Sequence, residues 1–233
     1  MKYTLIGHGG HSKVIKDLIE SRDGHQIIAY LDDKYELPDS ILDLYIGPVH
    51  SIYFILNQFP DVKIVMAIGN NATRKAIVEN LNLPDEHYCT LISKEAIISP
   101  GARIDVGSVV MPGAIINTDS KVGKHVIVNT GAIIDHDCSI GDYAHVSPKG
   151  CLTGSVTLEE GVLIGAGATV IPEINIGKWS LIGAGATVVK DVPDYCRAVG
   201  VPARVIEIRE GGGTIADGGK EKKNTSGNPS SKW

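Results

Sequence analysis

The sequence contains few aromatic residues, few cysteines and no long hydrophobic run. Phe, Trp and Tyr together make up only 5% of its 233 residues. The four cysteines lack CxxC spacing, which argues against a thiolate metal site or a disulfide framework. No apolar run approaches the roughly 20 residues of a membrane-spanning helix, and the first residues do not follow the signal-peptide pattern. We therefore expect a soluble, cytoplasmic chain without membrane insertion.

An excess of positive charge is also lacking. The formal net charge is −5 at pH 7, whereas binding to nucleic acid usually needs a basic patch or stripe. We therefore expect no nucleic-acid partner. The hydrophobic share of 43% is ample for a packed core.

The sequence is rich in aliphatic residues at a spacing of six. From Ile98 to Val188 every sixth residue is Ile, Val or Leu, and the residue four positions later is small or short-branched. This period is typical of a chain that turns a corner every six residues, so that three hexapeptides form one triangular coil. It predicts a left-handed parallel β-helix over residues 93–208, including a C-terminal cap. Cys138 falls on a small position, which predicts a buried free thiol.

Residues 1–92 follow a different pattern, in which apolar strands alternate with helices. Strands are predicted at residues 3–6, 27–31 and 62–68, with a further apolar segment at 44–46. This alternation favours a small, Rossmann-like parallel α/β sheet, whose ligands lie beyond the carboxyl ends of the strands. Residues 209–233 are rich in Gly, Lys, Ser and Asn, which predicts a disordered tail.

A glycine-rich turn, GHGGH at residues 7–11, lies between the first predicted strand and helix. Such a turn can present backbone N–H groups to a phosphate, although a tight turn that binds nothing would look the same. Ser12 occupies the third glycine position of the dinucleotide motif, which argues against a nicotinamide cofactor. Asp32 and Asp33 stand about where a ribose-binding acid would lie. Together these features favour a nucleotide-linked ligand.

His136 is the histidine that most suggests catalysis, because Asp135 and Asp137 flank it. A carboxylate that accepts the Nδ1 proton leaves Nε2 free as a base. Gly154 follows 18 residues later, one full coil, so we expect its amide above the histidine, aimed at a reacting oxygen. His145 lies half a coil away, and we expect it to line the same groove. The alternative for each histidine is a surface side chain without a function.

Two later coils carry the same small-residue run, GAGA at residues 165–168 and 183–186. Stacked small residues would leave a smooth trough in which a long, thin ligand lies against the backbone. The alternative is that these runs only satisfy the geometry of the corners.

Taken together, these features resemble the bacterial sugar O- and N-acyltransferases of the hexapeptide-repeat superfamily. The sequence is most similar to the UDP-4-amino-sugar N-acetyltransferases of bacillosamine synthesis, with sialic acid O-acetyltransferases and acetyltransferases of exopolysaccharide gene clusters of biofilm-forming bacilli as relatives. The likeness covers about residues 1–206. It rests on GHGGH at 7–11, LDD at 31–33, AIGNN at 67–71, Arg74-Lys75, Asn129-Thr130, IDHD at 134–137, HVS at 145–147 and GVPAR at 200–204.

The resemblance implies a homotrimeric enzyme with active sites between neighbouring β-helices. It implies acetyl-CoA as the donor, no metal, and a UDP-linked amino sugar or related small molecule as the acceptor, for exopolysaccharide or glycan biosynthesis. By motif, His136 is the general base, Asp137 or Asp135 its orienting acid, and the Gly154 amide the oxyanion donor. The implied coenzyme contacts are His145, Gly154, Ala166, Ala184 and Arg204. The implied contacts with the nucleotide sugar are Gly9, Gly10, His11, Asp32, Asp33, Gly69 and Asn129.

Three other functions compete with N-acetylation. A sugar O-acetyltransferase of the sialic-acid type would use the same site. A non-catalytic trimeric scaffold that binds a nucleotide sugar would not need His136. A γ-type carbonic anhydrase shares the β-helix, but His125, His136 and His145 include no close pair that fits its zinc site.

Overall fold

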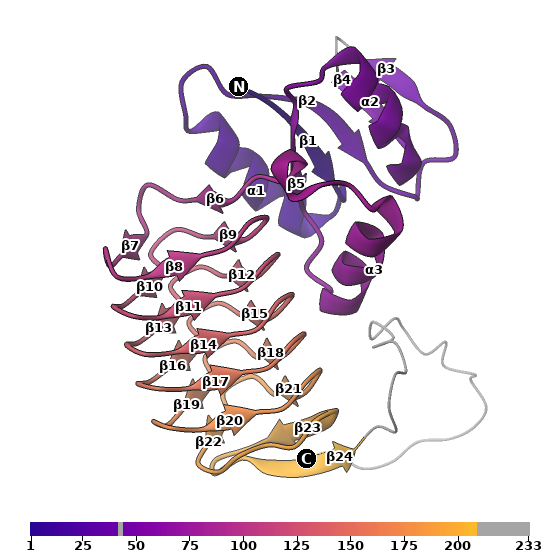
Figure 1. The fold of residues 1–233 in the computed structure, drawn as a ribbon. Coiled ribbons are helices and arrows are strands. Elements are labelled where there is room, and N and C mark those ends of the chain that lie inside the picture. Colours follow the sequence, from indigo (N-terminus) through magenta and orange to yellow (C-terminus); the bar gives the residue numbers. More distant parts are fainter. Residues whose placement is uncertain (42–43, 209–233) are drawn as a thin grey trace, which may run out of the picture.

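The protein consists of two bodies stacked end to end, an α/β domain and a triangular β-helix (Figure 1). The structure is a computed structural model that describes residues 1–41 and 44–208. The predicted tail at 209–233 lies outside the described residues. Both predicted fold classes are confirmed. None of the helices in the described ranges is long and apolar enough to cross a bilayer.

The α/β domain is built on a five-stranded sheet with the order β3-β4-β2-β1-β5, parallel except for β3 at the edge. The strands are β1 (Lys2–Ile6), β2 (Gln26–Leu31), β3 (Asp39–Ile41), β4 (Leu44–Gly47) and β5 (Lys63–Met66). The helices are α1 (Gly10–Glu20), α2 (Ile52–Gln58) and α3 (Asn71–Leu81), with short 3-10 helices η1 (Val49–Ser51) and η2 (Asp85–His87).

The sequence predicted β1, β2 and β5 as strands, the region of β4 as an apolar segment, and the helices that follow β1 and β5, which are α1 and α3. It did not predict α2, because a helix of seven residues is too short to display a clear period. Gly7, directly after β1, has a φ of +105°, and a Cβ atom there would lie 2.8 Å from the carbonyl oxygen of Ala67. Only glycine fits this close approach, which brings the start of α1 beside the end of β5.

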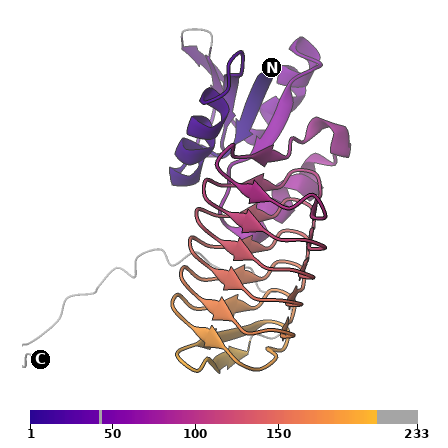
Figure 2. The same ribbon diagram turned by 90° about the vertical axis from the view of Figure 1, so that its left-hand side faces the viewer.

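Each coil of the β-helix contributes one short strand to each of three parallel sheets (Figure 2). Sheet A contains β6 (Leu91–Ile92), β9 (Val109–Val110), β12 (Ile127–Val128), β15 (His145–Val146), β18 (Leu163–Ile164) and β21 (Leu181–Ile182). Sheet B contains β7 (Ile97–Ile98), β10 (Ile115–Ile116), β13 (Ile133–Ile134), β16 (Cys151–Leu152), β19 (Thr169–Val170) and β22 (Thr187–Val188). Sheet C contains β8 (Arg103–Ile104), β11 (Lys121–Val122), β14 (Ser139–Ile140), β17 (Thr157–Leu158) and β20 (Asn175–Ile176).

The two ends of the β-helix are closed differently. At the C-terminal end, β23 (Cys196–Val199) extends sheet A and pairs antiparallel with β24 (Arg204–Ile208). At the N-terminal end, β6 already pairs with β9. The β-helix therefore begins at Leu91, slightly before the residue 93 that the sequence indicated.

The predicted six-residue period fills the interior of the β-helix. Ile116, Ile134 and Leu152 are fully buried, and Cys138 is a buried free thiol, as predicted. Edges AB, BC and CA are named here by the sheets that they join. In the triangular cross-section, edge BC lies opposite sheet A, and this relation decides which candidate site residues meet.

Candidate active site

Edge BC carries the predicted catalytic histidine. His136 lies between β13 and β14, and its Nδ1 is 2.8 Å from Oδ2 of Asp137. Asp137 has a φ of +60°, a left-handed backbone conformation that Asp tolerates better than most residues. No described residue hydrogen-bonds Nε2 of His136, so this nitrogen is available as a base.

Asp135 has a different task from Asp137. Its Oδ1 accepts the backbone N–H of His136 at 2.8 Å and Nδ2–H of Asn117 at 2.7 Å. The hydrogen bond to Asp137 is the largest cause that raises the pKa of His136, and the charge of Asp135 adds to it. Of the two carboxylates that the sequence left open, Asp137 is the one that contacts the imidazole.

Gly154 lies directly over His136, as the coil spacing predicted. A Cβ atom on Gly154 would lie 2.5 Å from Cε1 and 2.7 Å from Nε2 of His136, so a larger residue would displace the ring. Within the described ranges, the Gly154 N–H donates no hydrogen bond to another backbone or side-chain group. It can therefore donate to an oxygen that is bound close to the histidine.

A second cluster lies on sheet A, where the α/β domain meets the β-helix. His145, in β15, has its Nδ1 3.3 Å from the carbonyl oxygen of Gly69, which lies between β5 and α3. Its Nε2 is 3.1 Å from Nδ2 of Asn129, which follows β12 at edge AB. His11, in the first turn of α1, also approaches this cluster, and its Nε2 is buried without a partner. The fold thus brings together four predicted site residues from both bodies.

The histidines of this cluster are neutral at pH 7. Burial, followed by the charge of Arg74, lowers the pKa of His11 to about 4. Burial, followed by the charges of Arg74 and His11, lowers the pKa of His145 to about 3. Because protonation would add a positive charge beside Arg74 away from water, these imidazoles supply hydrogen bonds rather than charge.

Arg74, to which the sequence analysis gave no role, joins the two bodies. Its side chain is only 1% exposed. It donates to the carbonyl oxygens of Ile68 at 2.9 Å, His125 at 2.9 Å and Tyr143 at 2.7 Å. Figure 1 shows α3, which carries Arg74, lying against the side of the β-helix. The family motif around Arg74 was the signal in the sequence that could have identified it.

Within one chain, the two clusters do not meet. His136 lies at edge BC, whereas His145 lies in sheet A, on the opposite side of the triangular cross-section. The expectation that His136 and His145 line the same groove is therefore wrong for a single chain. Two residues that are half a coil apart in the sequence lie on opposite sides of the β-helix and not along the same edge.

The small-residue runs lie along edge AB, the edge that also carries Asn129. The N–H of Gly185 donates to the carbonyl oxygen of Ala166 at 2.9 Å, which stacks the two runs. Ala166 and Ala184 are both exposed. A Cβ atom on Gly165 would lie 2.5 Å from the nitrogen of Ala184, so corner geometry also demands small residues. The structure is thus compatible both with a trough for a long, thin ligand and with runs that only satisfy the geometry of the corners.

Arg204 lies in β24, at the far end of the β-helix. It lines a hollow of about 270 Å³ together with Lys190 and Asp191. The sequence analysis did not identify Lys190, which belongs to none of the quoted motifs. Two cationic side chains beside one hollow favour an anionic group such as a phosphate.

The N-terminus of α1 is open to a ligand. Gly9 is the N-cap residue, and no side chain caps this 11-residue helix. A Cβ atom on Gly9, Gly10 or Gly69 would meet nothing within 4 Å. The unpaired N–H groups and the helix dipole favour an anion at this position.

Asp32 and Asp33 shape the turns beside that helix end. Oδ2 of Asp32 accepts the N–H of His8 at 2.7 Å, and Oδ1 of Asp33 accepts the N–H of Val49 at 2.8 Å. A carboxylate can accept more than one hydrogen bond, so both retain capacity for a ligand. The ring of His8 stacks on Tyr30 with centroids 4.2 Å apart.

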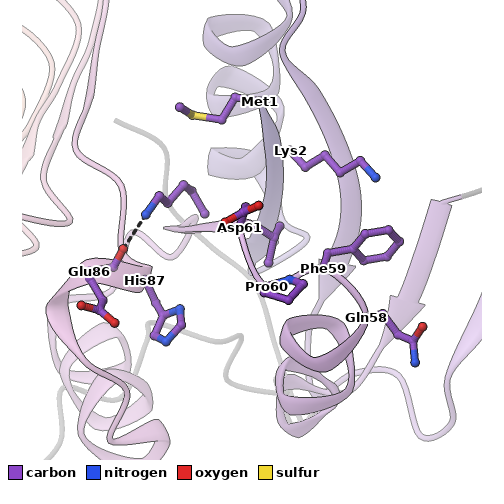
Figure 3. A pocket seen from close by; sticks show the side chains of 10 residues that line it. Met1, Lys2, Gln58, Phe59, Pro60, Asp61, Glu86 and His87 are labelled. Atoms are coloured by element: carbon purple, nitrogen blue, oxygen red, sulfur yellow. Dashed lines mark hydrogen bonds between the residues drawn. The ribbon is translucent and has the colours of Figure 1, made fainter.

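Two hollows of the α/β domain differ in their relation to the candidate site. One of about 340 Å³ adjoins the end of β2 and is lined by Leu31, Tyr45 and Phe54, among others. A larger one of about 830 Å³ lies at the amino ends of β1 and β5, beside Phe59 and His87 (Figure 3), and contains none of the predicted site residues. In residues 1–41 and 44–208, no group of three or more His, Cys, Asp or Glu residues is placed to hold a metal ion.

The fold and the two clusters define a class of hexapeptide-repeat protein with an added N-terminal α/β domain. The PglD N-terminal domain model matches residues 2–81. The chain is 44% identical over 108 residues to a UDP-N-acetylbacillosamine N-acetyltransferase of Bacillus subtilis (strain 168). That match covers 46% of this chain and 50% of the curated relative, so the chain matches about half of that relative's length.

Solved structures match nearly the whole described chain. PerB from Caulobacter crescentus in complex with CoA and GDP-perosamine has 33% identity and a TM-score of 0.80, over 89% of this chain and 98% of PerB. The acetyltransferase domain of PglB from Neisseria gonorrhoeae in complex with acetyl coenzyme A has 34% identity and a TM-score of 0.75, over 88% of this chain and 98% of that domain. The chain belongs to the bacterial sugar acyltransferases of the hexapeptide-repeat superfamily, as its motifs indicated.

The hydrogen bond between His136 and Asp137 predicts how substitutions change the pKa of His136. In Asp137→Asn the ring loses its charged hydrogen-bond partner, so the pKa of His136 should fall towards or below its ordinary value. Asp135→Asn, the matched control on the other side, should lower it less. Histidine NMR titration of both variants measures this, and a larger fall in Asp135→Asn would reverse the assignment of the orienting acid.

Proposed function

We propose that the protein transfers the acetyl group of acetyl-CoA to the amine of a nucleotide-activated sugar, in particular a UDP-linked 4-amino sugar. The single observation that carries this proposal is the His136–Asp137 pair beneath the unpaired amide of Gly154. The sugar would serve exopolysaccharide or other glycan biosynthesis in the cytoplasm; the similarity to a UDP-N-acetylbacillosamine N-acetyltransferase supports a role in glycan synthesis.

The proposed reaction is a direct attack of the sugar amine on the thioester. The amine binds neutral or loses a proton early, since an ammonium nitrogen has no free electron pair. Nε2 of His136 accepts a proton from the amine nitrogen as that nitrogen bonds to the carbonyl carbon. The Gly154 N–H stabilises the negative oxygen of the tetrahedral intermediate. When the carbon–sulfur bond breaks, His136 returns the proton to sulfur, so the products are the N-acetyl sugar and free CoA thiol.

The acceptor is proposed to lie at the carboxyl edge of the α/β sheet. The uncapped turn at Gly9 and Gly10 suits a diphosphate. Asp32 and Asp33 can accept hydrogen bonds from the nucleoside, and the apolar hollow beside Tyr45 offers room for a base. His11, Gly69 and Asn129 would then lie on the sugar side. The exposed alanines Ala166 and Ala184 would follow the pantetheine arm, with Arg204 and Lys190 near a coenzyme phosphate.

A homotrimer is part of the proposal because one chain carries the site in two separate parts. A threefold arrangement repeats one contact between unlike surfaces and closes on itself. Edge BC of one chain, with His136, would then face the side of its neighbour that carries Asn129 and Ala184. In this arrangement, the surfaces of one chain that bind acetyl-CoA and the sugar would face His136 of a neighbouring chain.

The proposed activity is tested by thiol release from acetyl-CoA with a panel of nucleotide-linked amino sugars. We expect release with a UDP-linked 4-amino sugar and a slower rate with its 4-hydroxy analogue. Sugar O-acetylation, the second candidate, would invert that order. No release with any acceptor would favour the non-catalytic scaffold.

His136→Ala should lower kcat about 10²–10⁴-fold, the usual contribution of a general base. The affinity for acetyl-CoA should stay unchanged, because the proposed coenzyme contacts lie elsewhere. His50→Ala, an exposed histidine of η1, is the matched control. An unaffected kcat in His136→Ala would remove this residue from the mechanism.

Asp32→Ala should raise KM for the nucleotide sugar about 10–100-fold, the effect of losing one hydrogen bond to a charged group. KM for acetyl-CoA should change little. Asp23→Ala removes an exposed carboxylate from the turn at the opposite end of β2, and it serves as the control. If KM for the nucleotide sugar is the same in both variants, the acceptor binds outside this edge of the sheet.

Mixed trimers test the shared site. His136→Ala lacks the base, and Ala184→Trp obstructs the proposed coenzyme path, so each variant alone should be inactive. We assume that His136 and the coenzyme path of one site come from neighbouring chains and that the two variants co-assemble in equal amounts. Each site then has an even chance of receiving an intact His136 and an even chance of receiving an intact coenzyme path, so about a quarter of the sites are complete. Light scattering measures the oligomer, and absence of any recovered activity would contradict sites shared between chains.

A further inference from the structure

The side-chain amide of Asn129 has a defined orientation. Its Oδ1 accepts the backbone N–H of Thr130 at 2.8 Å. A backbone N–H can only donate, so the atom that faces it is the oxygen. Nδ2 is therefore the atom that lies 3.1 Å from Nε2 of His145.

The orientation of Asn129 determines the tautomer of His145. Nδ2 carries only hydrogens, so Nε2 of His145 must accept with its lone pair. The proton of the neutral ring is then on Nδ1, which lies 3.3 Å from the carbonyl oxygen of Gly69. A carbonyl oxygen can only accept, so both neighbours of the ring require the same Nδ1–H tautomer.

Arg74 supports this arrangement from the α/β domain. Its Nη1 donates to the carbonyl oxygens of Ile68 at 2.9 Å and of Gly69 at 3.4 Å. Nε and Nη2 hold the carbonyl oxygens of His125 and Tyr143 in the β-helix. The loop that presents Gly69 to His145 is therefore tied to the same body that carries His145.

Burial and the neighbouring positive charge oppose protonation of His145 more strongly than the hydrogen bond to the Gly69 carbonyl oxygen favours it. Its nearest charged or titratable neighbours are Arg74 and His11, and burial together with both of them lowers its pKa. An imidazolium would also direct an Nε2–H at the NH₂ group of Asn129. The ring can therefore offer neither a charge nor an Nε2–H to a ligand.

We infer that His145 is a positioning residue that accepts from Asn129, and that Asn129 Nδ2–H, rather than an N–H of His145, is the donor presented to the acyl carbonyl oxygen. The second hydrogen on Nδ2 has no acceptor among the described residues. Across the proposed trimer contact, Asn129 of one chain would thus supply a second hydrogen bond beside that of Gly154 of its neighbour. This inference rests on the proposed acetyl transfer, and it assigns to Asn129 the contact with the acyl group instead of the coenzyme contact that the family resemblance implied for His145.

The tautomer is tested without any activity assay. Neutron diffraction of the full chain, or ¹⁵N NMR of its labelled histidines, should show a proton on Nδ1 of His145 and none on Nε2. A proton on Nε2 at pH 7 would overturn the inference even if the protein proves to be an acetyltransferase. If no acceptor releases thiol, the proposed function fails while this measurement still decides the tautomer.

Asn129→Asp replaces the donor by an acceptor of nearly the same shape. It should raise the pKa of His145, because the ring then gains by donating at Nε2. It should also lower kcat about 10²–10³-fold, the loss expected for one oxyanion donor, with little change in KM for acetyl-CoA. Asn175→Asp adds the same charge at an exposed position in sheet C and should change neither. Unchanged kcat or an unchanged pKa of His145 in Asn129→Asp would overturn the inference.

Two substitutions of His145 separate positioning from proton transfer. His145→Gln carries an acceptor and a donor at about the separation of the two ring nitrogens, so it should keep kcat within about tenfold. His145→Leu leaves Asn129 without its acceptor and should lower kcat as far as Asn129→Asp does. Equal losses in both variants would show that the ring itself transfers a proton, against the inference.

Discussion

The hydrogen bonds between successive coils are the constraint on which the rest of this structure depends. Ile133 N–H donates to Gly150 at 2.8 Å, and Asp135 N–H donates to Leu152 at 2.9 Å, so each residue is held beside the residue one coil later. Because these bonds involve only backbone, they fix the position of side chains that take no part in them. Gly154 lies over His136 for this reason. The geometry of the proposed base and oxyanion donor is thus set by the scaffold and needs no contact between the two groups.

Arg74 is the corresponding constraint between the two bodies. A buried guanidinium normally needs a carboxylate, but here backbone carbonyl oxygens accept its hydrogen bonds. Burial lowers its pKa to about 9, which still leaves it protonated at pH 7. These carbonyl groups come from both bodies, so separating the bodies would take from the guanidinium part of its hydrogen-bond partners. The α/β domain is therefore held in one position on the β-helix, and Gly69 stays in register with His145.

The sequence was sufficient to predict the features that follow from the six-residue repeat of aliphatic residues. The aliphatic spacing revealed the coil, and the coil length placed Gly154 over His136. It was not sufficient for features that depend on direction around the β-helix, which is why His145 was expected beside His136. It marked Arg74 only as part of a family motif, and it did not show that Arg74 links the two bodies, because the backbone carbonyl groups that bind this side chain leave no pattern in a sequence. The choice between Asp135 and Asp137 likewise depended on the backbone conformation at the corner.

The proposed division of the site between two sides of the β-helix has a physical reason. An edge of a narrow β-helix presents a single column of corner residues, too little surface to surround a coenzyme, a sugar and a base together. A groove between two such columns would supply walls from both, and the proposed threefold closure would generate that groove without a second gene product. The proposed base at edge BC needs only the stacked coil beside it for support. His145, which accepts from the proposed donor Asn129, is held by the Gly69 carbonyl oxygen of the α/β domain, so each half of the proposed site lies where its own support is available.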